Sequence, residues 1–197
     1  MIIVLDGMDA TYKSTIARKL QNYGFTTIRF PYYREEVNKK LLHAKSIEEK
    51  AQIFFEDMKK VIIKIDKNNN YVFDRSFVST FLYQGIEISE KEKIPYEEAL
   101  TRLYNIMKNT IDYTNIIDQI FILTVSDNDY LNRTINRDHI DNIDEAYDKL
   151  DFQRKIREKI PYVTKFLIEH NLNVTIIDTS GKSSDKILEK EILPRIT

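Results

Sequence analysis

The sequence predicts an α/β fold in a single domain, residues 1–197, with a five-stranded parallel sheet flanked by helices. Short runs of consecutive apolar residues, bounded by turn signals, indicate fully buried strands. These runs alternate with longer segments whose apolar residues recur at helical spacing. Buried strands joined by crossover helices favour a parallel sheet covered on both faces. The chain has only 4 Gly and 4 Pro, and no linker or low-complexity segment divides it.

The strands are expected where apolar and β-branched residues cluster. The five candidates are residues 2–6, 25–30, 71–74, 119–125 and 173–177. The first, Ile-Ile-Val-Leu-Asp, has the composition of a strand buried on both faces. Pro31 ends the second strand, and three asparagines at 68–70 form the turn before the third.

The helices are expected between the strands. The candidate segments are residues 14–23, 35–43, 47–65, 76–83, 96–113, 129–137, 143–170 and 186–193. Gly24 occupies a helix C-cap position after the first segment. Pro95 opens the helix at 96, with Glu97 and Glu98 in the first turn, where the helix dipole favours acidic residues. Pro161 predicts a break in the long segment 143–170.

Composition excludes several classes of function. The 30 basic and 31 acidic residues give a net charge of -1, which argues against a nucleic-acid-binding protein or one bound to anionic membrane. The absence of Cys excludes disulfides and thiol catalysis, and it fits a cytoplasmic location. The sequence has only 3 His, widely spaced, which argues against a histidine metal cluster. No apolar run approaches the ~18 residues of a membrane span.

The loop after the first strand carries most of a phosphate-binding motif. The pattern G-x-x-x-x-G-K-[ST] is met by Gly7, Lys13 and Ser14, between a buried strand and an amphipathic helix. In this motif, backbone N–H groups and the lysine bind phosphates, and the hydroxyl binds Mg²⁺. The alternative is an ordinary helix N-terminus with an incidental Lys-Ser-Thr.

Tyr12 stands where the motif has its second glycine. A left-handed non-glycine residue costs about 1–2 kcal/mol, against a total stability of about 5–15 kcal/mol. Tyr12 should therefore permit folding, and any harm would come from crowding the phosphates.

The loop after the third strand carries a more specific pattern. Asp74 and Arg75 follow the strand, Ser79 comes four residues after the arginine, and Tyr83-Gln84-Gly85 completes the run. An ion pair capping a helix would explain Asp-Arg but not the whole run. The run resembles that of thymidylate kinases, which are P-loop kinases with an arginine-bearing lid.

Weaker similarities extend the resemblance to about residue 180. They are Gly7-Met8-Asp9, Arg29-Phe30-Pro31, Phe55 to Lys59, Leu123-Thr124-Val125, the pair Arg133 and Arg137, and the long helix with Phe152 and Arg157. The resemblance implies a lid that comprises about residues 129–145.

The resemblance implies a role for each matching residue. The ATP-binding loop would comprise Gly7, Met8, Asp9, Ala10, Thr11, Tyr12, Lys13, Ser14 and Thr15. The acceptor would be bound by Asp9, Phe30, Phe55, Lys59, Arg75, Ser79, Thr80 and Tyr83. Mg²⁺ would be bound by Ser14 and Asp74. The catalytic groups would be Lys13, Arg75, Arg133, Arg137 and Asp9, with one or both lid arginines closing over the transferring phosphate.

Several alternatives stay open at this point. Phe55 is expected to stack on a thymine ring or to be a core aromatic, and the lid arginines could form a solvated basic face. Lys59 stands where the family usually has Arg, and the two are not interchangeable, which leaves base specificity open.

The expected activity is transfer of phosphate from ATP to dTMP, giving dTDP, by a cytoplasmic homodimer. The alternatives are a kinase for dUMP or a 5-substituted pyrimidine nucleotide, a deoxynucleoside kinase, and a nucleotide-binding protein with little catalysis because of Tyr12.

Overall fold

The computed structural model describes residues 1–113, 115–138 and 143–196, with side chains for all of these except 136–138 and 143–148. It contains one five-stranded sheet of order β2-β3-β1-β4-β5, in which every neighbouring pair is parallel. The strands are β1 Ile2–Gly7, β2 Phe25–Arg29, β3 Asn70–Asp74, β4 Gln119–Thr124 and β5 Val174–Asp178. The predicted α/β class and the predicted parallel sheet are confirmed.

The helices follow the predicted segments with shifted ends. They are α1 Lys13–Leu20, α2 Arg34–Leu41, α3 Ile47–Ile62, α4 Phe77–Glu92, α5 Tyr96–Thr110, α6 Asp127–Asp138, α7 Ile143–Glu169 and α8 Ser184–Ile187. A 3₁₀ turn, Gln21–Tyr23, extends α1, and a π-helical turn, Leu188–Ile192, extends α8. Gly24 closes the first of these turns with a φ of 82°, as its predicted capping role requires.

Two helices differ clearly from expectation. The predicted segment 76–83 is the first half of α4, which runs on to Glu92. Gly85 lies inside α4, where the Tyr96 ring packs closely against it. A Cβ added at Gly85 would lie only 3.0 Å from Cε2 of Tyr96. The predicted break at Pro161 does not occur, since α7 is continuous through it.

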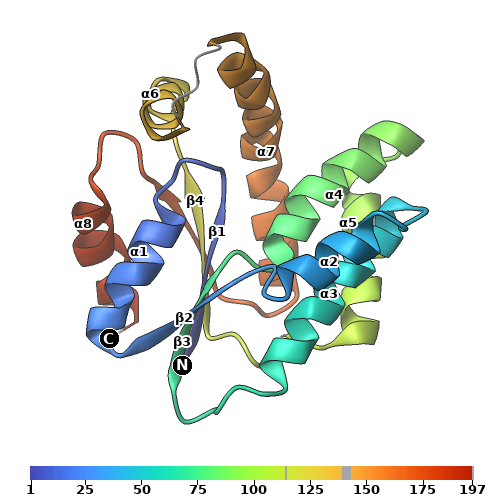
Figure 1. Ribbon diagram of the computed structural model, residues 1–197, viewed down its shortest axis with the longest axis horizontal. Helices are drawn as coiled ribbons and strands as arrows, with labels where there is room; N and C mark the ends of the chain where they lie inside the picture. The colour runs from blue at the N-terminus through green and yellow to red at the C-terminus, as the bar shows by residue number, and fades with distance from the viewer. Residues whose placement is uncertain (114, 139–142, 197) are drawn as a thin grey trace.

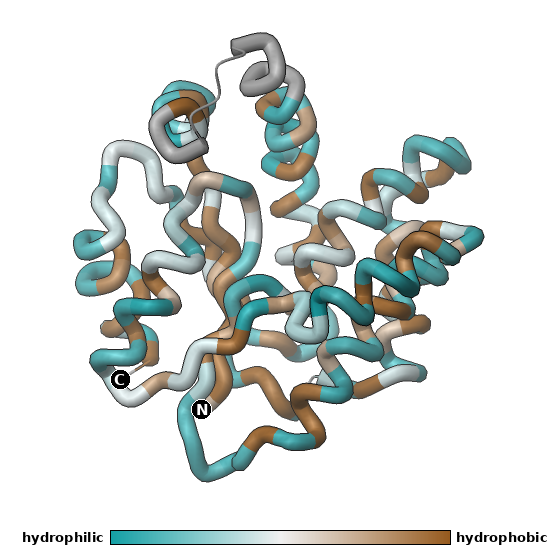
Figure 2. Tube along the Cα trace, viewed as in Figure 1, coloured by the Kyte–Doolittle hydropathy of each residue, from teal (hydrophilic) through white to brown (hydrophobic). Residues whose placement is uncertain are grey.

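The helices cover both faces of the sheet. Figure 1 shows α1 and α8 on one side and α3, α4, α5 and α7 on the other. The strands form the apolar centre of the molecule in Figure 2, and the outward faces of the helices are largely hydrophilic. No helix among the described residues is both long and apolar enough to cross a membrane.

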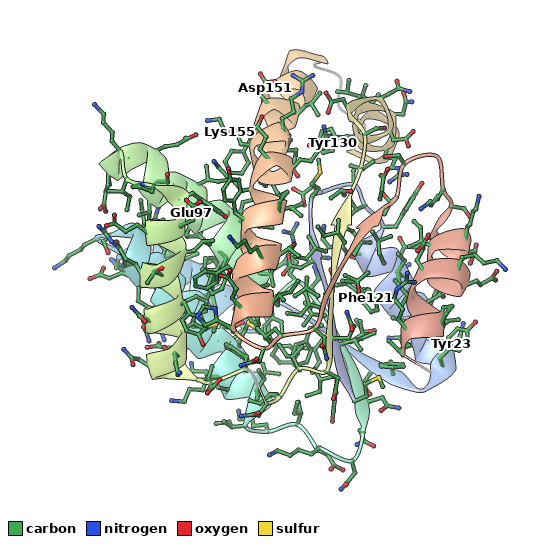
Figure 3. The ribbon with its side chains drawn as sticks, turned by 180° about the vertical axis from the view of Figure 1, so that it is seen from behind. Tyr23, Glu97, Phe121, Tyr130, Asp151 and Lys155 are labelled. Atoms are coloured by element: carbon green, nitrogen blue, oxygen red, sulfur yellow. The ribbon has the colours of Figure 1, made fainter. Side chains whose placement is uncertain are left out.

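Two apolar cores hold these layers together. The larger lies under α3, α4, α5 and α7 and includes Phe55, Phe77 and Phe81. The smaller lies under α1 and α8 and includes Ile16, which is fully buried, and Phe121, which is labelled in the rear view of Figure 3. The two cores hold the sheet between the helices and so fix the positions of the strand ends.

The strand register brings the loops after four strands to one edge of the sheet. Leu5 in β1 and Arg29 in β2 both pair with Asp74 in β3. Gly7 pairs with Leu123 in β4. The carboxyl ends of β1, β2, β3 and β4 therefore meet at this edge, which is where parallel sheets bind ligands.

Gly7 makes the tightest backbone contact at this edge. A Cβ at Gly7 would lie 2.4 Å from the carbonyl oxygen of Leu123, and its φ is +108°. We expect Gly7→Ala to lower the free energy of unfolding by about 3–5 kcal/mol, since both the clash and the backbone angle oppose a side chain. Urea denaturation followed by circular dichroism measures this loss.

Gly181→Ala is the matched control. Gly181 also has a positive φ, of +63°, but no atom lies within 4 Å of its would-be Cβ. It should lose only about 1–2 kcal/mol through backbone strain. Equal losses in the two variants would show that the contact with Leu123 is unimportant.

Candidate active site

The loop between β1 and α1 lines a cavity of about 880 Å³. Seven consecutive loop and helix residues, from Asp9 to Thr15, face it, as do Arg18, Arg29, Asp74, Arg75, Asn132 and Arg133. Five of these lining side chains are basic and two are acidic. The cavity is therefore electropositive and suited to a polyphosphate. Gly7 and Met8, predicted with the loop, lie beneath it, and Met8 is fully buried in the core.

The loop contains two left-handed non-glycine residues. Tyr12 has a φ of 66° and Ala10 a φ of 56°. Tyr12 therefore adopts the backbone geometry for which the motif has glycine, directly before α1 begins at Lys13. The loop thus keeps its turn with tyrosine in place of glycine, at the cost of backbone strain at Tyr12.

Lys13 is folded back onto the loop. Its Nζ donates to the carbonyl oxygen of Met8, to that of Gly7 at 3.4 Å and to Thr11 Oγ1 at 3.3 Å. Burial, together with the like charge of Arg75, lowers the pKa of Lys13 to about 8. Oxygen atoms of the loop thus hold the Lys13 ammonium group next to the cavity. An anion that binds in the cavity would raise the pKa of Lys13.

This pKa makes polyphosphate binding pH-dependent. Below pH 8 Lys13 is protonated in the free protein, and above pH 8 it becomes neutral. Bound phosphate favours the charged form, so binding ATP above pH 8 must take up a proton. We expect ATP affinity to fall as pH rises from 7 to 9.5, by up to about tenfold per unit above pH 8.

Titration calorimetry in two buffers of different ionisation enthalpy measures the proton uptake directly. Uptake should approach one proton at pH 9 and vanish in Lys13→Met. Uptake that is the same in both proteins would assign the effect to another group.

Ser14 and Asp74 lie together at the floor of the cavity. Ser14 Oγ donates to Asp74 Oδ2 at 2.5 Å, and Arg29 Nε lies 3.7 Å from the same oxygen. A hydroxyl and a carboxylate are the hard oxygen donors that Mg²⁺ prefers, and Mg²⁺ in phosphate sites commonly takes one or two protein ligands. The described residues contain no group of three or more His, Cys, Asp or Glu that could hold a metal ion by itself. The pair therefore fits Mg²⁺ bound jointly with a nucleotide.

Asp9 joins the two loops. Arg75 Nη2 lies 2.5 Å from Asp9 Oδ1, and Tyr83 Oη donates to Asp9 Oδ2 at 3.3 Å. Burial alone would raise the pKa of Asp9, but the charges of Lys13 and Arg75 outweigh it and hold that pKa below its usual value. Asp9 therefore stays ionised between the two basic groups.

Gln153 of α7 completes this network. Its Oε1 accepts from Asp9 N at 2.8 Å, and its Nε2 donates to Asp9 Oδ2 at 3.2 Å. Its side chain is nearly fully buried. Sequence reasoning missed Gln153, because a lone glutamine 144 residues away carries no local signal.

Asp6 fixes the loop that bears Arg75. Its carboxylate accepts from Ser76 Oγ at 2.8 Å and from Ser79 Oγ at 2.6 Å. Burial raises the pKa of Asp6, although these donors oppose the shift. Arg75 has a left-handed φ of 72°, and the bonds to Ser76 and Ser79 hold the chain directly after it. Asp6 thus aims the Arg75 guanidinium toward the site.

A second cavity, of about 260 Å³, adjoins the first. It is lined by Arg29, Phe30, Pro31, Arg34, Phe54, Asp57, Met58, Arg75, Ser76, Ser79, Thr80, Tyr83 and Gln84. Arg29 and Arg75 line both cavities. The second cavity thus combines a cationic side shared with the first cavity and an apolar wall containing Phe30, Phe54 and Met58. Of the predicted acceptor residues, Phe30, Arg75, Ser79, Thr80 and Tyr83 lie here.

Phe55 and Lys59 do not line this cavity. Phe55 is fully buried and packs edge-on against Phe81, with ring centroids 6.3 Å apart. Lys59 is exposed on α3. Phe54 and Met58, one residue earlier in each case, face the cavity instead. Phe54 and Met58 therefore occupy the positions at the cavity that were expected for Phe55 and Lys59, and Phe55 is a core aromatic.

The lid is described only in part. Arg133 lies on α6 and lines the first cavity, with 13% of its side chain exposed. The Arg137 side chain and residues 139–142 of the predicted lid lie outside the described residues. The expected pairing of the two arginines over a phosphate therefore stays a prediction.

Arg34 and Asp57 are two further residues that sequence reasoning missed. Arg34 begins α2 and lines the second cavity. Asp57 accepts from the backbone N–H groups of Tyr32 and Tyr33, at 2.7 and 2.9 Å. A basic residue in the turn after the second strand was the signal available for Arg34, whereas Asp57 carried none.

The whole arrangement defines a P-loop nucleotide kinase fold. The structure is similar to thymidylate kinase from Candida albicans, with a TM-score of 0.67 and 16% identity over 95% of this chain and 87% of that one. It is also similar to thymidylate kinase from Ehrlichia chaffeensis, with a TM-score of 0.59 and 18% identity over 93% and 89% of the chains.

A third similar structure is deoxyadenosine kinase from M. mycoides with bound dATP, with a TM-score of 0.54 and 17% identity over 96% of each chain. No protein-family model matches the sequence, and no curated protein does so either. At these identities the likeness establishes the fold, which agrees with the resemblance found in the sequence.

Proposed function

We propose that this protein is an ATP- and Mg²⁺-dependent nucleoside monophosphate kinase whose acceptor is dTMP. The observation that carries the proposal is the pair of adjoining cavities that share Arg29 and Arg75. A polyphosphate in the first cavity and a nucleotide in the second would bring their phosphates together at these two guanidinium groups. Arginine forks bind phosphate oxygens with two parallel hydrogen bonds.

The charge of the second cavity favours an acceptor that already carries a phosphate. Arg29, Arg34 and Arg75 all line it. The lining has three cationic groups and one carboxylate, Asp57, so it carries an excess of positive charge that an acceptor phosphate would neutralise and a free nucleoside would not. This argument favours a monophosphate kinase over a nucleoside kinase, although deoxyadenosine kinase shares the fold.

The chemistry follows from these positions. An oxygen of the acceptor's 5'-phosphate attacks the γ-phosphorus of ATP in line, a new P–O bond forms, and the bond to the β-phosphate oxygen breaks to release ADP. Lys13, Arg29 and Arg75 neutralise the charge on the transferring group. Asp9 and Tyr83 orient the sugar, and Mg²⁺, when bound by Ser14 and Asp74, neutralises phosphate charge.

The apolar wall supports a base of the pyrimidine class without fixing which one. Phe54 and Phe30 offer aromatic surface, and Gln84 and Thr80 offer hydrogen bonds to a base edge. Lys59 is exposed and Met58 faces the cavity, so no charged group of α3 other than Asp57 lies there. Thymine, uracil and 5-substituted uracils present the same O4, N3–H and O2 groups, so dUMP or a 5-substituted pyrimidine nucleotide is a second candidate acceptor.

A coupled ADP-release assay with ATP and Mg²⁺ tests the proposal. The acceptor panel comprises dTMP, dUMP, dCMP, dAMP, dGMP and free thymidine. We expect dTMP to give the highest kcat/KM and thymidine to give no turnover. Turnover with thymidine but not with dTMP would contradict the monophosphate acceptor. No turnover with any acceptor, together with normal ATP binding, would favour a non-catalytic binder.

A further inference from the structure

Tyr12 makes a specific contact with Arg133. The guanidinium carbon of Arg133 lies 4.2 Å from the centroid of the Tyr12 ring. This is well within the distance at which an arginine is attracted to an aromatic face. The contact joins the residue that replaces the second glycine of the loop to the first turns of α6.

Arg133 also donates hydrogen bonds to two carbonyl oxygens and a hydroxyl. Its Nη1 donates to the carbonyl oxygen of Ala10 at 2.9 Å and to Thr179 Oγ1 at 3.0 Å. Its Nη2 donates to the carbonyl oxygen of Thr179 at 2.7 Å. These three bonds take most of the donors that the guanidinium fork presents.

Thr179 is itself firmly held. It is fully buried, and both its N–H and its hydroxyl donate to the carbonyl oxygen of Thr124, at 2.9 and 2.8 Å. Arg133 therefore connects the phosphate loop to a fixed point between the ends of β4 and β5. The free rotation that a mobile catalytic arginine needs is absent from this arrangement.

The contacts fall where the loop is strained. Ala10 and Tyr12 both have left-handed backbones, and Arg133 binds the Ala10 carbonyl and the Tyr12 ring. A glycine adopts such a conformation freely, whereas a tyrosine needs surrounding contacts to keep it there. The Tyr12 ring supplies such a contact, which glycine lacks.

We propose that Tyr12 and Arg133 form a clip that holds the phosphate loop in its phosphate-binding conformation. Tyr12 takes over the task of the absent glycine, and Arg133 is a positioning residue instead of an arginine that closes over the transferring phosphate. This inference rests on the proposed function of the loop, namely binding the phosphates of ATP.

Binding of Mg²⁺-tripolyphosphate, measured by titration calorimetry, tests the clip without a base or a reaction. We expect Arg133→Met and Tyr12→Gly each to weaken tripolyphosphate binding about tenfold or more, since each removes the stacked pair. The double variant should bind no more weakly than Arg133→Met, because Arg133→Met already lacks the stacked pair as well as the bonds to Ala10 and Thr179. Tyr12→Phe, which keeps the ring face, should recover most of the affinity that Tyr12→Gly loses.

Two further measurements separate the clip from general damage. Amide hydrogen exchange at residues 8–12 should be faster in Arg133→Met and Tyr12→Gly, with exchange in β1 and β4 unchanged. Arg195→Met removes an arginine that binds Glu191 outside both cavities, and it should leave tripolyphosphate affinity unchanged. Thermal unfolding verifies that each variant is folded at the temperature of the titration.

Four results would overturn the clip. If ATP binds more weakly to the variants but tripolyphosphate does not, Arg133 contacts the base. If tripolyphosphate affinity is unchanged and kcat alone falls, Arg133 acts on the transferring phosphate. If the folded wild-type protein does not bind tripolyphosphate, both the phosphate-loop assignment and the clip are wrong. If the variants change neither tripolyphosphate affinity nor hydrogen exchange, the clip is wrong and the phosphate-loop assignment stands.

Discussion

Lys13→Met is expected to lower kcat by about 10²–10³-fold or more, while the protein stays folded. Lys13 places an ammonium group beside the cavity in which we propose that the ATP phosphates bind, and charge stabilisation of this kind is the largest contribution to phosphoryl transfer. Its Nζ is bound to carbonyl oxygens of the loop, within a cavity lined by four arginines. Steady-state kinetics with saturating ATP and dTMP measures the loss.

Folding should not suffer from this change. Burial already opposes the charged form of Lys13 and lowers its pKa to about 8, so methionine of similar length removes an unfavourable burial of charge. The melting temperature should be equal or higher. Lys19→Met, on the opposite side of α1 where Lys19 pairs with Asp185, is the matched control. Near-normal turnover in Lys13→Met would mean that the phosphate loop is misassigned.

Arg75→Met is expected to raise the KM for dTMP by about 10²-fold or more, with the KM for ATP changed by less than about threefold. Arg75 lines the acceptor cavity, and its left-handed backbone and the bonds of Asp6 to Ser76 and Ser79 fix its direction. Removing it also leaves Asp9 without its closest cationic partner. Initial rates over a grid of both substrates separate the two KM values.

Arg75→Lys and Arg102→Met give this prediction its controls. Lysine keeps the charge but loses the planar fork, so Arg75→Lys should recover only part of the dTMP affinity. Arg102 pairs with Glu92 and Glu98 on the surface, and its loss should change neither KM. An equal rise in both KM values for Arg75→Met would contradict its role as acceptor clamp.

The sequence was sufficient for the fold and for the two loops of the site. Strands that are buried on both faces appear as short apolar runs, so β1 and β3 could be placed almost to the residue. The spacing of Gly7, Lys13 and Ser14 located the phosphate loop, and the left-handed conformation expected at position 12 is confirmed for Tyr12. The strand order was not predictable, because it depends on which crossovers pass over which face.

The errors came from helix orientation and long-range contacts. Phe54 and Phe55 are adjacent, and a rotation of about 100° decides which one faces the cavity and which one the core. Helical periodicity places both near the apolar face, so only the packing of Phe55 against Phe81 separates them. Gln153 reaches Asp9 across 144 residues of chain, and the contacts of Arg133 with Ala10 and Thr179 likewise have no local signal.

Product analysis with γ-³²P-labelled ATP tests the central claim most directly. The protein is incubated with labelled ATP, Mg²⁺ and dTMP, and the nucleotides are separated by chromatography, with Lys13→Met run in parallel. We expect the label in dTDP, at its terminal phosphate, and only background in Lys13→Met. Label that appears solely as orthophosphate would contradict transfer to an acceptor phosphate. Transfer of label to thymidine in a parallel incubation, with none to dTMP, would contradict it as well.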